Sequence, residues 1–78
     1  RGDAGVTWVA NYAARRVVRI DADGRQSVAL ASDRKFRPVG VFKHGQRLFV
    51  LEHGSDGIRV RVKDLRTGQV NHVVYLSD

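Results

Sequence analysis

The feature that most constrains this chain is a pattern that occurs twice. The stretch "RRVVRIDADGRQ" at 15–26 and the stretch "IRVRVKDLRTGQ" at 58–69 both alternate apolar with basic residues, and both then reach an Asp-containing turn with glycine. Successive side chains of a β-strand point to opposite faces, so a period of two residues is typical of strands and not of helices. The chain is therefore expected to consist of repeated β-hairpins.

The same period continues through the rest of the 78 residues. It predicts an all-β fold with no helix longer than about one turn. Segments rich in Gly, Asp and Ser separate the strands, as expected for turns. Seven antiparallel strands are predicted, at residues 5–11, 15–21, 25–31, 39–43, 46–52, 58–64 and 70–76.

The two copies define a repeat unit. Val9 corresponds to Val50 and Ile20 to Val62, and the separation grows along the chain because the loops of the second copy are longer. A repeat of about 40–45 residues with four short strands per unit is typical of a β-propeller blade. We therefore treat the chain as a single all-β unit that contains two blades. It spans 1–78, with repeat 1 at 5–33 and repeat 2 at 38–78.

Two longer stretches resemble a particular kind of blade. "TWVANYAARRVVRID" and "RPVGVFKHGQRLFVLEHGSDGIRVRV" are similar to the NHL-type blade of six-bladed propellers, a superfamily that includes lactonases and arylesterases. That blade has a Pro-x-Gly-Val strand, a turn, an aromatic-Val strand ending in a polar residue, a loop, and an Arg-Val-x-Arg strand. The resemblance covers nearly the whole chain and implies four-stranded antiparallel blades.

The two predicted blades are unequal. Repeat 2 supplies four strands, but repeat 1 supplies three, because residues 1–5 are too short and glycine-rich to form the innermost strand. Propellers close into rings in which each blade covers its neighbours. The chain is thus expected to be part of a larger propeller or a subunit of a ring-forming oligomer, with other blades as its partners. The alternative fold is a small closed β-barrel or sandwich.

The function expected from this architecture is that of a non-catalytic β-propeller binding module, with a protein or small molecule as ligand. One alternative, implied by the resemblance, is part of a six-bladed calcium-dependent hydrolase of the lactonase–arylesterase kind. In that alternative His53 is the candidate catalytic residue, since it follows the strand "RLFVLE". The residue before it is Glu52 where the enzymes have Asn, and Val39 stands where they have a second His.

A second alternative is binding of RNA or another polyanion through arginine-rich strand faces. Lys and Arg total 14 against 8 acidic residues, a formal net charge of +6. Alternation predicts that the basic residues of 58–64 are more exposed than Ile58, Val60 and Val62. Aromatic residues fall on the apolar faces, so base stacking is not expected. The candidate polyanion-binding residues are Arg15, Arg16, Arg19, Arg59, Arg61 and Lys63.

No cofactor is expected outside the hydrolase alternative, in which calcium would be needed. The chain has no cysteine, which excludes disulfides and thiolate metal sites, and its three histidines lack zinc-ligand spacing. The "DADG" turn at 21–24 lacks the later ligands of an EF-hand loop. Apolar runs are only a few residues long, so no membrane insertion is expected.

Overall fold

The computed structural model describes residues 5–55 and 57–76 of the chain, and these form seven β-strands and no helix. Both the all-β class and the number of strands agree with the sequence prediction. The strands are β1 (Thr7–Asn11), β2 (Arg16–Ile20), β3 (Gln26–Ala31), β4 (Phe36–His44), β5 (Arg47–Gly54), β6 (Gly57–Asp64) and β7 (Val70–Leu76).

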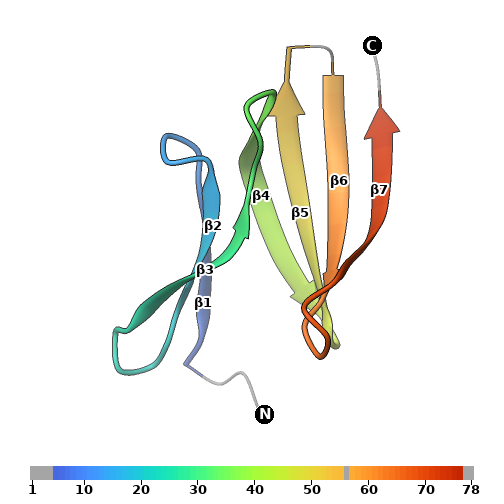
Figure 1. Ribbon diagram of the computed structural model, residues 1–78. Coiled ribbons are helices and arrows are strands. Elements are labelled where there is room, and N and C mark those ends of the chain that lie inside the picture. The colour runs from blue at the N-terminus through green and yellow to red at the C-terminus, as the bar shows by residue number, and fades with distance from the viewer. Residues whose placement is uncertain (1–4, 56, 77–78) are drawn as a thin grey trace.

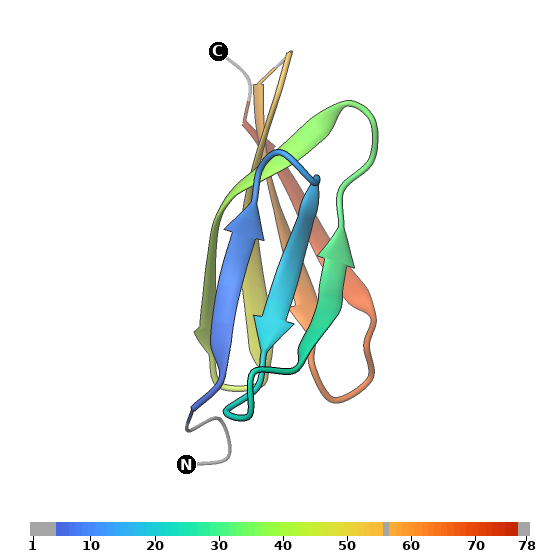
Figure 2. The same ribbon diagram turned by 90° about the vertical axis from the view of Figure 1, so that its left-hand side faces the viewer.

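The strands form two antiparallel sheets. β1, β2 and β3 make a three-stranded sheet in chain order, and β4 to β7 make a four-stranded sheet in chain order. Figure 1 shows the two sheets next to each other, and Figure 2 shows the first lying in front of the second. Strands β1 and β2 pack against β4, so the sheets meet face to face. Neighbouring propeller blades and a small sandwich share this arrangement.

The segment between the sheets is shorter than predicted. Strand β4 begins at Phe36, not at residue 39, because Phe36 pairs with Gly54 and an irregularity at Val39 lets both halves of β4 stay paired with β5. At Gly54 the chain passes very close to the linker, since an added Cβ would lie 2.5 Å from the Lys35 carbonyl oxygen. Only glycine allows this approach. The linker at 32–35 is therefore held against the end of β5.

The hydrophobic core lies between the sheets. Val17 and Leu30 from the first sheet meet Leu48 and Val50 from the second, and all four are buried. Antiparallel pairing puts residues directly opposite each other on one face, so the pairing of Val17 with Leu30 explains why both point inward. The partly buried residues around the core are Trp8, Ala29, Val41 and Leu65.

The prediction that the basic residues of 58–64 are the exposed set is wrong. Arg59 is only 6% exposed and Val62 is also buried, whereas the other four residues of the two sets are half-buried, so the basic and apolar sets are comparably buried. The register places Arg59 opposite Glu52 and Arg61 opposite Val50, so this basic set faces the first sheet. Alternation alone separates the two faces of a strand but does not say which face is covered.

Leu48 is the largest fully buried side chain of this small core. Leu48→Ala is expected to lower the free energy of unfolding by about 2–5 kcal/mol, because a buried cavity replaces the side chain. The matched control is Leu76→Ala, since Leu76 is 55% exposed on an edge strand. Urea denaturation at low protein concentration measures both, and equal effects would show that the core is misplaced.

Candidate functional site

Glu52 is the only glutamate in the chain and has no exposed surface. It lies near the end of β5, on the face that meets the first sheet. Its Oε1 accepts hydrogen bonds from Arg59 Nε at 2.8 Å and from Arg61 Nε at 2.8 Å. Its Oε2 accepts bonds from Arg61 Nη2 at 2.8 Å and from the Ser32 hydroxyl. One buried carboxylate therefore holds two guanidinium groups.

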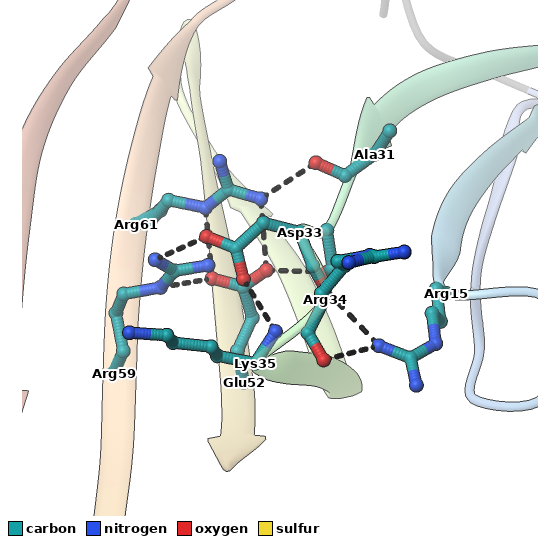
Figure 3. A network of polar contacts seen from close by, with 9 residues as sticks. Arg15, Ala31, Asp33, Arg34, Lys35, Glu52, Arg59 and Arg61 are labelled. Atoms are coloured by element: carbon teal, nitrogen blue, oxygen red, sulfur yellow. Dashed lines mark hydrogen bonds and ion pairs between the residues drawn. The ribbon is translucent and has the colours of Figure 1, made fainter.

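The same cluster reaches both sheets (Figure 3). Arg61 Nη2 donates to the Ala31 carbonyl of β3 at 2.9 Å, and Arg59 Nη1 donates to Asp33 Oδ2 at 3.2 Å. The Arg59 guanidinium also covers the Phe36 ring, 3.9 Å from its centroid. These contacts, which we call the Glu52 cluster (Ser32, Asp33, Glu52, Arg59 and Arg61), connect the first sheet and the linker to β5 and β6.

The two arginines control the ionisation of the cluster. Burial alone would raise the pKa of Glu52, but the hydrogen bonds from Arg61, Arg59 and Ser32 outweigh it and hold that pKa below its ordinary value. Burial would lower the pKa of Arg59, and its bond to Glu52 instead keeps the pKa raised. Glu52 and Arg59 are thus charged near neutral pH, and both arginines of the cluster are bonded to carboxylates. This arrangement holds a structure together and leaves no group ready for proton transfer.

The predicted polyanion-binding residues are divided by the fold. Arg59, Arg61 and Lys63 point between the sheets, where Arg59 and Arg61 contact Glu52 and the Lys63 ammonium donates to the Ala29 carbonyl. Arg16 and Arg19 are exposed. Arg15, Arg16 and Arg19 lie on the first sheet and its turn, so the six residues do not form one surface. Binding of a polyanion by these residues remains a prediction.

His53 is exposed and lies within β5, which extends to Gly54 instead of ending at Glu52. It lines an open cleft together with Ser55. Among residues 5–55 and 57–76, no group of three or more His, Cys, Asp or Glu side chains is placed to hold a metal ion. The described part of the chain also has no helix long and apolar enough to cross a bilayer. A catalytic role of His53 remains a prediction.

The outer face of the four-stranded sheet, which points away from the first sheet, is the second notable surface. Phe42 and Phe49 stack there, with ring centroids 4.9 Å apart and planes tilted by 8°. Phe42 is 61% exposed. Both residues lie on an apolar face, as alternation predicts, but the first sheet does not cover this face. The apolar residues of this outer face are Phe42, Phe49, Leu51, Ile58, Val60, Val62, Val74 and Leu76.

Comparisons with protein-family models, with curated proteins and with solved structures found no match for this chain.

Removing the charge of Glu52 should destabilise the fold strongly. Glu52→Gln leaves Arg61 without a counter-charge and leaves Arg59 with only the exposed carboxylate of Asp33, which is expected to cost about 3–5 kcal/mol of unfolding free energy. The control is Asp23→Asn, which removes a carboxylate from an exposed turn and should change stability by about 0.5 kcal/mol or less. Chemical denaturation of both variants at pH 7 measures the difference, and similar losses would contradict a structural role for the cluster.

Acid should weaken the wild-type fold through the same group. Because the pKa of Glu52 is lowered by folding, its contribution is complete above the ordinary glutamate value of 4.5 and is lost as the pH falls through the lower folded value. Asp33, whose pKa is also lowered, adds to this loss below its ordinary value of 3.8. Unfolding free energy measured from pH 6 to pH 2 should drop below about pH 4.5, and the drop should be smaller in Glu52→Gln.

Proposed function

We propose that this chain is a non-catalytic interaction module made of two propeller-type blades, and that it docks further sheets of the same kind on its two outer faces. The docked sheet belongs to a second copy of the chain or to further repeats joined to it. The observation that carries the proposal is the apolar outer face of the four-stranded sheet. Burying a side chain such as Phe, Leu or Val is worth about 1.5–3 kcal/mol, so an open face of this kind favours association.

The strand registers support an equivalence between the two sheets. Asn11 pairs with Arg16 across β1 and β2, as Glu52 pairs with Arg59 across β5 and β6. Strands β1, β2 and β3 therefore correspond to β5, β6 and β7. With this register, the predicted equivalence of Ile20 with Val62 changes. Val62 pairs with Phe49 across the strands, and Phe49 corresponds to Trp8. Val62 thus matches Arg19, the partner of Trp8, and not Ile20.

This equivalence gives each sheet two different faces. Within the chain, the face of the first sheet that carries Trp8 packs against the face of the second sheet that carries Val50. We call such a contact between two sheets a seam. On the outside, the second sheet presents the face of Phe49, which corresponds to Trp8. The first sheet presents the face of Val9, which corresponds to Val50. The two open faces are therefore of the same two types that pack together within the chain. The outer face of the second sheet of one chain should dock on the outer face of the first sheet of the next chain.

Two matched substitutions test this head-to-tail docking. Val28 lies on the outer face of the first sheet and is 53% exposed, while Val74 lies on the outer face of the second and is 50% exposed. Val28→Asp and Val74→Asp each introduce a buried charge into one of the two proposed contacts. Light scattering and sedimentation compare the wild-type chain, each variant and their equimolar mixture, and far-UV circular dichroism verifies that each variant is folded.

We expect the wild-type chain to associate, each variant alone to be monomeric, and the mixture to form a one-to-one dimer. The mixture has one intact face of each type, so it can make a single contact and then stop. A wild-type chain that stays monomeric at high concentration would contradict the proposal. Dimers of Val28→Asp alone would also contradict it, because they would show that two four-stranded sheets pair with each other.

A further inference from the structure

A basic cleft lies where three segments of the chain meet. The turn between β1 and β2, the linker between β3 and β4, and the end of β5 all lie at the upper end of the molecule in Figure 1. Between them is an open cleft with a volume of about 260 Å³. The residues that line it are Tyr12, Arg15, Arg34, Lys35, Arg37, His53, Gly54 and Ser55.

Four of these lining residues carry a positive charge, and none carries a negative charge. Within the described residues, none of Arg15, Arg34, Lys35 and Arg37 forms an ion pair with a carboxylate. This contrasts with Arg59 and Arg61, whose charges are matched by Glu52. Like charges gathered in one cleft repel each other, so a bound anion would relieve the repulsion.

Two of the four cations are held in place by the backbone. Arg15 Nη1 donates to the Arg34 carbonyl at 2.6 Å and to the Asp33 carbonyl at 3.3 Å, as Figure 3 shows. Arg15 has a φ of 59°, a left-handed conformation that is rare for a residue with a side chain. Such outliers are concentrated at functional sites, where the surrounding contacts enforce them. The Nε and Nη2 groups of Arg15 bond to no described residue and remain available as donors.

Arg37 is fixed in a similar way by Tyr12. Its Nη1 donates to the Tyr12 carbonyl at 3.3 Å, and its guanidinium carbon lies 5.0 Å from the centroid of the Tyr12 ring. A guanidinium group has five N–H donors, so one backbone bond leaves several for a ligand. Arg34 and Lys35 are exposed on the linker, and their side chains bond to no described residue. The cleft therefore combines two anchored cations with two adaptable ones.

Two other clefts among the described residues are less suited to an anion. One is lined by Asp33, Phe36, Arg59 and Tyr75 together with the two linker cations. Its Arg59 already contacts the carboxylates of Asp33 and Glu52. Another, at the opposite end of β5, includes Asp64 among its lining residues. A carboxylate at the cleft wall repels an incoming anion. Of these three clefts, the one lined by Arg15 and Arg37 is the best candidate.

We propose that this cleft binds the phosphate group of a small phosphorylated molecule. Planar guanidinium groups match the oxygens of a phosphate and bind them in pairs, and Lys35 adds a point charge. A water molecule occupies about 30 Å³ in the liquid, so the cleft holds a phosphate and a small organic body. All lining residues belong to one chain. The proposal therefore does not depend on sheet docking, and either can fail without the other.

Titration calorimetry of the full chain with inorganic phosphate, and then with glycerol phosphate, tests the proposal. The variant is Arg34→Ala/Lys35→Ala, because these side chains make no contact that the fold needs. The matched control is Arg25→Ala/Arg66→Ala, which lowers the net charge equally at two exposed turns away from the cleft. We expect the cleft variant to bind both probes at least about tenfold more weakly, and the control to differ by about twofold or less, as expected for lost charge-assisted bonds.

Equal weakening in both double variants would overturn the proposal, because it would show that only net charge attracts the anion. No binding of either probe by the wild-type chain at millimolar concentration would also overturn it. A third titration uses a single-stranded oligonucleotide. Tight, strongly salt-dependent binding of the oligonucleotide without binding of glycerol phosphate would replace a small-molecule site with a polyanion surface.

Discussion

The structure depends on one buried carboxylate. Glu52 has no exposed surface, yet it accepts bonds from two arginines and a serine, so its charge is fully compensated. A chain of this length buries only a small core, which among the described residues is a cluster of four side chains, and cannot rely on burial alone. The Glu52 cluster adds directional contacts where the apolar core ends. It fixes which faces of the two sheets meet, because only one face of β6 carries the arginines.

The local structure of this chain could be predicted from its sequence, since a two-residue period defines strands directly. All seven strands were predicted, and all of their ends are within three residues of the observed ones. The arrangement of their faces could not be predicted. Arg59 and Phe42 exchange their expected environments, because a paired arginine is as acceptable between sheets as an apolar residue. That choice depends on a single glutamate opposite Arg59, a signal visible only once the register is known.

The basic cleft illustrates a similar limit for functional residues. Arg15 was recognised as a candidate for anion binding, but as a member of a strand face that includes Arg16 and Arg19. The fold instead brings it beside Arg34 of the linker and Arg37 of β4, two residues that lie between the strands predicted at 25–31 and 39–43. The close approach of the linker to Gly54 produces this grouping. A contact between residues 19 positions apart, such as that of Arg15 with Arg34, leaves no trace in local patterning.

The neutral residue at position 11 has a consequence for any assembly of these chains. Asn11 occupies in the first sheet the place that Glu52 occupies in the second, so the seam between chains would lack the buried ion cluster of the seam within a chain. A ring of such chains would therefore alternate two kinds of seam, and its number of blades would be even. Of the four to eight blades that propellers contain, it could have four, six or eight, but never five or seven.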